Sequence, residues 1–255
     1  MKKFIKNKNL KPKRFGLVGR NISYSFSAGY FKAKFEKADL ENYTYTNFDI
    51  DNISQLPEII ENTKRLKGFN VTIPYKEAVI PLLDKVSKTA QLIGAVNTIV
   101  ISKKGTKGFN TDHYGFRKAL EPMLLPHHQK ALILGTGGAS KAIAYALRQL
   151  KIEYDFVSRT ATDVIYAYED IDKDVFDDYQ IIINTTPLGT FPNVDECPPI
   201  DYSHFTNKHI AFDLVYNPAE TEFMKRAAQN GATISNGYEM LVHQAEKAWK
   251  IWNKK

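Results

Sequence analysis

The chain has 255 residues, of which 43% are hydrophobic and 25% charged, a composition typical of a globular protein with one large domain or two ordinary ones. No apolar run approaches membrane-spanning length. The net charge of +7 comes from residues 1–14, which hold seven basic residues and no acid, whereas the rest of the chain is balanced. This basic leader predicts only weak, salt-sensitive attraction to polyanions, so we expect no specific nucleic-acid partner and no membrane partner.

The leader also lacks the features of an export signal. It has no apolar segment and no small-residue cleavage site, and it is poor in Arg and Ser. The single Cys197 cannot form a disulfide within the chain. We therefore expect a cytoplasmic protein.

The first part of the chain alternates between strand-like and helix-like segments. We predict strands at 15–19, 43–48, 69–73, 95–101 and 108–112, and helices that begin at Ser27 and cover 55–66 and 76–92, the last interrupted near Pro81. Tyr30, Phe31, Phe35 and Ala38 should form the apolar face of the first helix. This alternation indicates an α/β unit with a mostly parallel sheet.

A second α/β unit is expected from about His113 onward. We predict strands at 131–134, 152–157, 179–184, 210–216 and 232–235, and helices at 114–124, 141–148, 221–229 and 238–252. The segment between 157 and 179 leaves little room for a full crossover helix, so we expect one face of this unit's sheet to have less helical cover.

A glycine turn follows the first strand of this second unit. Gly135-x-Gly137-x-x-Ser140 stands between an apolar strand and a good helix former. Glycines in that context let backbone N–H groups approach a pyrophosphate at the positive N-terminus of the helix. The pattern predicts a dinucleotide site.

The next strand supplies evidence about which dinucleotide binds. It ends in Ser158-Arg159-Thr160, where an NAD site would place an acidic residue. A guanidinium suits a 2′-phosphate through its charge and its fork of donors. We therefore predict NADP(H) rather than NAD(H).

Polar residues interrupt several of the predicted strands of the first unit. Asn70 and Thr72 alternate with apolar residues, Asn97 and Thr98 break another strand, and 110–112 end a third. Because ligands bind at strand ends in α/β sheets, this clustering favours a polar ligand rich in hydroxyls.

Two further side chains are candidates for chemistry. Lys76 follows Pro74 at a strand end and could act as a general acid/base together with a carboxylate such as Asp112. Gln244 lies on the apolar face of the last helix and could donate to a substrate carboxylate or hydroxyl. The six histidines offer no metal-ligand spacing, so no metal site is expected.

Taken together, these stretches resemble the shikimate dehydrogenase family from about residue 15 onward. The resemblance is carried by seven motifs in order: Phe69-Asn-Val-Thr-Ile-Pro-Tyr-Lys76, Gly94-Ala-Val-Asn-Thr98, Gly108-Phe-Asn-Thr-Asp-His-Tyr-Gly115, Leu134-Gly-Thr-Gly-Gly-Ala139, Ile183-Asn-Thr-Thr-Pro-Leu-Gly189, Asp213-Leu-Val-Tyr-Asn-Pro218 and Asn236-Gly-Tyr-Glu-Met-Leu-Val-His-Gln244. Any one of them is modestly specific, whereas seven in order are highly specific.

The resemblance implies a fold and a reaction. The fold would be α/β with two domains: a substrate domain at 1–112, completed by the helix at 239–255, and a Rossmann-like NADP-binding domain at 113–238. The reaction would be the NADP-dependent reduction of 3-dehydroshikimate to shikimate, in aromatic amino acid biosynthesis. Partners would be this small-molecule substrate and the cofactor, with the chain a monomer or homodimer.

The same resemblance implies roles for individual residues. Lys76 and Asp112 would form the catalytic pair, and the substrate would be bound by Ser25, Ser27, Thr72, Asn97, Asp112, Tyr216 and Gln244. NADP(H) would be bound by Gly135, Thr136, Gly137, Gly138, Ala139, Ser158, Arg159, Thr160, Thr185, Thr186, Leu214 and Gly237.

The sequence departs from the family pattern at three places. The usual His-Ser-x-Ser-Pro is Tyr24-Ser-Phe-Ser-Ala28, the usual Asn-Arg-Thr is Ser158-Arg-Thr160, and the helix usually found after it is missing. The first change keeps both serines, and the second keeps the arginine but removes a neighbouring amide. The proposed catalytic pair is untouched.

Several alternatives remain open. A quinate/shikimate dehydrogenase that uses NAD or NADP is the nearest, and a folate-linked dehydrogenase of the same fold is more distant. A non-catalytic NADP(H)-binding sensor would explain the cofactor motif but not the presence of both Lys76 and Asp112. A nucleic-acid-binding role would rest only on the basic leader.

Overall fold

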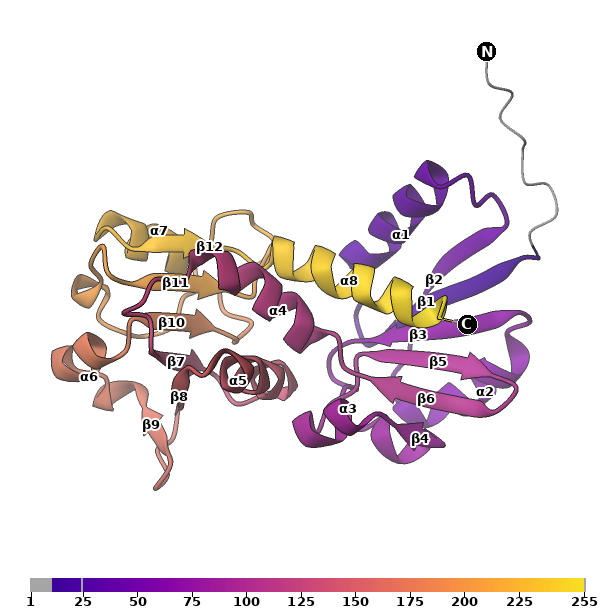
Figure 1. Ribbon diagram of the computed structural model, residues 1–255, viewed down its shortest axis with the longest axis horizontal. Coiled ribbons are helices and arrows are strands. Elements are labelled where there is room, and N and C mark those ends of the chain that lie inside the picture. The colour runs from indigo at the N-terminus through magenta and orange to yellow at the C-terminus, as the bar shows by residue number, and fades with distance from the viewer. Residues whose placement is uncertain (1–10, 24, 255) are drawn as a thin grey trace, which may run out of the picture. The chain divides into compact units, whose positions relative to one another are not determined.

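The computed structural model describes residues 11–23 and 25–254, and it divides into two compact units (Figure 1). One unit contains the described residues up to Asn110 together with those from Ala248 onward, and the other is Thr111–Lys247. Each unit is built around its own six-stranded sheet. The expected α/β class with two sheets is confirmed.

The sheet of the first unit is mixed. Its strand order is β2-β1-β3-β5-β6-β4, with bounds β1 Lys13–Gly19, β2 Tyr43–Asp49, β3 Leu66–Val71, β4 Lys85–Val86, β5 Thr98–Ser102 and β6 Gly105–Phe109. Strand β1 pairs in parallel with β2 and β3, whereas the β5–β6 hairpin continues the sheet in antiparallel pairing from β3. The hairpin turns at residues 103–104, directly before Gly105 begins β6.

The helices of the first unit differ in part from the prediction. They are α1 Phe26–Lys37, α2 Leu56–Asn62 and α3 Lys88–Ile93. Ser25, rather than Ser27, caps α1, because its side chain accepts from the Ser27 N–H. Phe31 and Phe35 are buried as expected, but Ala38 lies at the exposed C-cap.

The helix expected over 76–92, with an interruption near Pro81, is wrong except at its end, where α3 lies. Residues after Pro74 form turns, a 3-10 turn at Ile80–Leu82 and the short strand β4 before α3 begins. The β4 strand pairs with β6, a contact between segments far apart in sequence that overrides the local helical pattern. The helix predicted over 55–66 is also shorter, because α2 ends at Asn62 and Leu66 begins β3.

The last helix, α8 Tyr238–Trp252, has the predicted bounds, and its final residues complete the first unit. Trp252 packs against Phe15 and Phe31 and donates a 2.9 Å hydrogen bond from its indole N–H to the carbonyl of Ile99. Trp249 packs against Phe15 and Phe35. This aromatic cluster anchors the C-terminus on the N-terminal sheet.

The sheet of the second unit is wholly parallel. Its order is β12-β11-β10-β7-β8-β9, with bounds β7 Lys130–Leu134, β8 Glu153–Ser158, β9 Ile165–Ala167, β10 Ile181–Asn184, β11 Ile210–Asp213 and β12 Thr233–Ser235. The chain builds outward from β7 to β9, then returns to the other side of β7 and continues from β10 to β12. The strand order therefore reverses between β7 and β10, which is where such sheets bind ligands.

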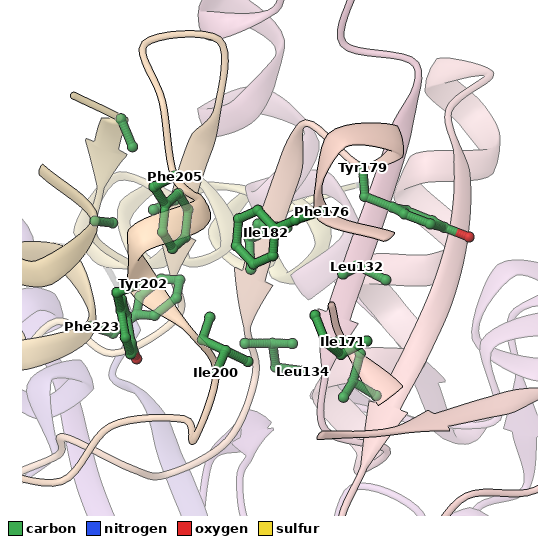
Figure 2. Close-up of a cluster of buried hydrophobic side chains, with 14 of the residues drawn as sticks. Leu132, Leu134, Ile171, Phe176, Tyr179, Ile182, Ile200, Tyr202, Phe205 and Phe223 are labelled. Atoms are coloured by element: carbon green, nitrogen blue, oxygen red, sulfur yellow. The ribbon is translucent and has the colours of Figure 1, made fainter. Parts of the chain in front are cut away.

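Alternate residues of the central strands face two separate cores. The helices of this unit are α4 Asp112–Leu120, α5 Gly138–Leu150, α6 Lys173–Asp178 and α7 Glu222–Gln229. On one face, α4 and α5 cover Ile133 and Ile183. On the other, Leu132 and Ile182 pack with Phe176 of α6 and Phe223 of α7 (Figure 2).

The segment after β8 is shortened, as the sequence predicts. Only residues 159–164 connect β8 to the parallel strand β9, and the six-residue α6 follows before β10. Across the part of the chain that the structure describes, no helix is long and apolar enough to cross a membrane.

Candidate active site

The proposed cofactor residues lie at one edge of the parallel sheet in the second unit. They follow the C-terminal ends of four strands: β7 ends at Leu134, β8 at Ser158, β10 at Asn184 and β11 at Asp213. Because all of these strands are parallel, their ends share one edge. The sequence therefore placed the glycine turn, Arg159, Thr185 and Leu214 on the same side of the sheet.

The glycine turn sits at the point where strand order reverses. Gly135 has φ +106°, a conformation that side-chain-bearing residues rarely adopt. A Cβ on Gly135 would lie 2.9 Å from the Thr185 hydroxyl oxygen and 3.1 Å from the Thr186 methyl group. The Thr185 hydroxyl in turn donates to the carbonyl of Leu134 at 2.7 Å. Both the backbone angle and the space require glycine here.

The N-terminus of α5 fits an anion. Gly137 is its N-cap without a side-chain cap, its Cβ position faces open space, and the first turn carries no acid. Ser140, fully buried, donates to the Gly137 carbonyl at 2.6 Å and so fixes the turn. Backbone N–H groups and the helix dipole remain for a pyrophosphate, so the residues present fit a dinucleotide.

Arg159 stands at the end of β8 with an exposed side chain. Its charge acts on Tyr168, although burial dominates and raises the pKa of that phenol. Ser158 is half-buried and Thr160 is exposed. The guanidinium is therefore available at the position where a ribose would lie.

Leu214 and Gly237 are adjacent although they are far apart in the sequence. The Gly237 N–H donates to the Val215 carbonyl at 3.0 Å, and a Cβ on Gly237 would overlap the carbonyl oxygen of Leu214. Gly237 thus allows the start of α8 to approach the loop after β11.

Lys76 lies in the first unit, in the turns that follow β3. Its backbone carbonyl accepts from the Val96 N–H at 2.7 Å, which ties it to the segment that carries Asn97. The neighbouring Tyr75 is buried, and its hydroxyl donates to the carbonyl of Ile50 at 2.6 Å. The lysine side chain is half-buried, and its backbone is held from both sides.

Ser25, Ser27 and Thr72 follow the ends of β1 and β3, which are parallel and so end at the same side of the first sheet. Ser25 and Ser27 open α1 and are half-buried, and no acid stands in that helix's first turn. Thr72 lies just beyond β3, with its N–H donating to the carbonyl of Val18 at 2.9 Å. A Cβ on Gly19 would meet the Thr72 methyl at 2.6 Å, so this glycine lets the two strand ends approach.

Asn97 belongs to a network of polar side chains. It is buried, and its side-chain oxygen accepts from the Thr98 hydroxyl at 3.1 Å. Asn70 donates to the Asn97 carbonyl and to the Thr98 oxygen, both at 3.2 Å, and accepts from the Tyr45 hydroxyl at 2.8 Å. Burial raises the pKa of the Tyr45 phenol, and a hydrogen bond with the Ser27 side chain opposes that rise.

Asp112 and Gln244 lie on α4 and α8, two helices that pack against each other in the second unit. Asp112 is buried at the first residue of α4, one turn before Gly115. A Cβ on Gly115 would lie 3.1 Å from the Gln244 Cβ and would overlap the carbonyl of Met240, so α4 and α8 pack closely there (Figure 1). Tyr216 follows β11 and is half-buried. Lys76, Asn97 and the serines lie in one unit, and Asp112, Tyr216 and Gln244 in the other.

The structure gives hydrogen-bonding roles to three polar residues for which the sequence predicts none: Tyr45, Asn70 and Asp213. In the sequence, Asn70 stands out only as a polar residue within a strand, and Tyr45 has the pattern of an ordinary strand aromatic. Asp213 could have been found, because an acid directly after the apolar run 210–212 is unusual at a buried strand end. Among the described residues, no cluster of three or more His, Cys, Asp or Glu side chains could hold a metal ion.

Comparison with known proteins agrees with this geometry. Residues 17–99 match the model for the shikimate dehydrogenase substrate binding domain. The NADP(+) shikimate dehydrogenase of Methanosphaera stadtmanae is 36% identical, over 94% of this chain and 91% of that protein.

Solved structures extend the agreement to the fold. A shikimate dehydrogenase in complex with NADP+ is 34% identical, with a TM-score of 0.84, over 95% of this chain and 90% of that one. The Thermus thermophilus shikimate 5-dehydrogenase in complex with NADP(H) and shikimate is 32% identical, with a TM-score of 0.83, over 94% of this chain and 93% of that one. The chain therefore belongs to the shikimate dehydrogenase family.

Proposed function

We propose that this protein is the enzyme that reduces 3-dehydroshikimate to shikimate with NADPH, in the shikimate pathway. The observation that carries the proposal is the glycine turn at Gly135, which abuts Thr185 where strand order reverses, with Arg159 at the next strand end. The named activity of relatives that match nearly the whole chain supports the substrate.

The cofactor would be held along one sheet edge. The N–H groups at the start of α5 would bind the pyrophosphate, with Gly135, Thr136, Gly137, Gly138 and Ala139 forming the turn. Ser158, Arg159 and Thr160 would bind the 2′-phosphate. Thr185, Thr186, Leu214 and Gly237 would line the nicotinamide side. When bound, the cofactor supplies the hydride that reduces the C3 carbonyl.

The substrate would be held mainly by hydrogen bonds. Ser25 and Ser27, beside the positive end of α1, would bind its carboxylate, with Tyr216 nearby. Thr72, Asn97, Asp112 and Gln244 would bind its hydroxyl groups. We also propose that 1–112, completed by 239–255, forms the substrate domain, and that 113–238 forms the cofactor domain, which would contribute Tyr216 to the substrate site.

The proton would come from the lysine. Its ammonium group would stabilise negative charge as it forms on the C3 oxygen and would donate a proton to it. Asp112 would orient that group and accept from a substrate hydroxyl. Hydrogen bonds to the Lys76 carbonyl and from the Tyr75 hydroxyl would hold the backbone from which the lysine side chain extends.

One observation favours a second candidate, a dehydrogenase that also uses NAD or quinate. The connection 159–164 contains a single cation, Arg159, and also Asp163, so only one charged side chain would attract the 2′-phosphate. The enzyme would then prefer NADP but would also use NAD.

The assay that tests the proposal follows nicotinamide absorbance with purified protein and pairs shikimate or quinate with NADP+ or NAD+. We expect turnover that is fastest with shikimate and NADP+. Comparable rates with quinate or NAD+ would support the second candidate. Absence of turnover in all four combinations, with NADP+ still bound, would favour a sensor.

We also propose a cytoplasmic location and a monomeric or homodimeric state. The balanced charge outside the leader and the single free Cys197 support the former. Light scattering after gel filtration would measure the oligomeric state.

A further inference from the structure

Asp213 is a fully buried carboxylate that accepts hydrogen bonds from three separate segments. Its Oδ1 accepts from the Asn184 amide at 3.0 Å and from the Val215 N–H at 2.9 Å. Its Oδ2 accepts from the Thr221 hydroxyl at 2.6 Å. The three donors stand at the end of β10, in the loop after β11 and at the N-cap of α7.

The bond to Asn184 leads directly to the loop after β10. With its NH2 group facing Asp213, Asn184 presents its oxygen to Thr186, whose N–H and hydroxyl donate to it at 3.0 and 2.6 Å. The Thr186 oxygen then accepts from the Leu188 N–H at 3.3 Å. The Asn184 NH2 group also donates to the Leu188 carbonyl at 3.4 Å, so two acceptors, this carbonyl and the closer Asp213 carboxylate, fix which way the amide points and hold the loop 185–188.

The bond to Val215 fixes the second loop. Val215 accepts through its carbonyl from the Gly237 N–H at 3.0 Å, and Leu214 packs against Gly237. Thr221 caps α7 through the Met224 N–H at 3.3 Å. One side chain thus joins the segments that carry Thr186, Leu214 and Gly237.

This arrangement is costly for stability. Within the described residues, no lysine or arginine forms an ion pair with Asp213, and burial raises its pKa to about 6 despite the three hydrogen bonds. A neutral asparagine of the same size would avoid the desolvation of a charge. However, it would bring an NH2 group to face at least one of the three donors.

We propose that Asp213 is a positioning residue for the nicotinamide half of the cofactor, acting through Asn184 on the loop 185–188 and through Val215 on Leu214. It touches neither substrate nor cofactor itself. The inference rests on the proposed function, because it needs these loops to line the nicotinamide. The glycine turn at 135–139 and Arg159, which would hold the adenosine half, have no hydrogen bond to Asp213 among the described residues.

The test measures binding of two ligands to the full chain by calorimetry. NADP+ engages both halves of the proposed site, whereas adenosine 2′,5′-bisphosphate lacks the nicotinamide. For Asp213→Asn we expect the Kd of NADP+ to rise about tenfold and that of the bisphosphate to change less than twofold. General loss of stability would weaken both ligands together.

A second pair of variants covers the case in which Asp213→Asn does not fold. Thr221→Val removes one donor from the carboxylate and should raise the Kd of NADP+ about threefold. Thr221→Ser keeps the hydroxyl, so its Kd for NADP+ should equal that of wild type. Tyr179→Phe is the matched control, because it removes a hydrogen bond to Asp155 in the same unit, away from these loops, and should leave the ratio of the two Kd values unchanged.

The outcomes separate the inference from the function on which it rests. If wild-type protein binds NADP+ but the variants change both ligands equally, or neither, the positioning role is wrong and the proposed function stands. If wild-type protein binds neither ligand, the proposed function fails, and the inference fails with it.

Discussion

The hydroxyl of Tyr45 on β2 donates a 2.8 Å hydrogen bond to the side-chain oxygen of Asn70 on β3. Asn70 then donates to the carbonyl of Asn97 and to the hydroxyl of Thr98. The same phenol interacts with Ser27 at the start of α1. One tyrosine therefore links residues that we assign to opposite ends of the substrate.

Replacing Tyr45 with Phe should weaken substrate binding more than it slows chemistry. The side-chain oxygen of Asn70 would lose its donor, at a cost of about 1–2 kcal/mol in the free energy of unfolding. We expect the KM for shikimate to rise several-fold with kcat nearly unchanged. Steady-state kinetics and urea denaturation measure the two effects.

Tyr43→Phe is the matched control for this variant. Tyr43 lies on the same face of the same strand, and its ring packs against Phe15 and Trp249. No hydrogen bond of the Tyr43 hydroxyl is found among the described residues, so the KM of Tyr43→Phe for shikimate should match that of wild type. A rise in KM equal to that of Tyr45→Phe would contradict the role of the Tyr45–Asn70 bond.

Replacing Lys76 with Ala should abolish most of the turnover. A general acid that also stabilises a developing oxyanion contributes about 10²–10⁴-fold to the rate, and kcat should fall by that factor with a small change in KM. Lys104→Ala, at an exposed position in the β5–β6 turn, is the control. A Lys76→Ala enzyme with near-normal kcat would remove the lysine from the mechanism.

Replacing Arg159 with Ala should reduce the preference for NADP+. A charge-assisted pair with a phosphate contributes about 1.5–3 kcal/mol, so the KM for NADP+ should rise about 10- to 100-fold while that for NAD+ stays within about twofold. Arg226→Ala, which breaks an exposed ion pair with Glu222, should change neither value. Equal losses for both cofactors would show that Arg159 does not bind the 2′-phosphate.

Asp213 should make stability depend on pH in a defined direction. Its pKa of about 6 in the folded protein lies above its ordinary value of 3.8, so between these values the folded protein keeps a proton that the unfolded chain releases. The stability contributed by this group is complete below pH 3.8 and is lost as pH rises through 6.

The difference in unfolding free energy between wild type and Asp213→Asn should therefore fall by up to about 3 kcal/mol between about pH 4 and about pH 7.5. Urea denaturation at several pH values measures it, and other carboxylates cancel in the difference. A difference that does not vary with pH would mean that Asp213 ionises normally in the folded protein.

The sequence by itself determined the elements whose signals are local. The apolar run before Gly135, the three glycines and the helix former after them specify a strand, a turn and a helix, and the structure has all three. The periodicity of α8 predicted its bounds at both ends. These elements form as predicted because residues close together in the sequence specify them.

Only the tertiary structure decided the features that depend on distant partners. The apolar spacing of 76–92 is helical, but β4 pairs with β6, and Val96 donates to the carbonyl of Lys76. Tyr45 and Asn70 are 25 positions apart, and Asp213 and Asn184 are 29 apart. A buried polar group must find a partner wherever the fold places one, so its role becomes visible only when the chain has folded.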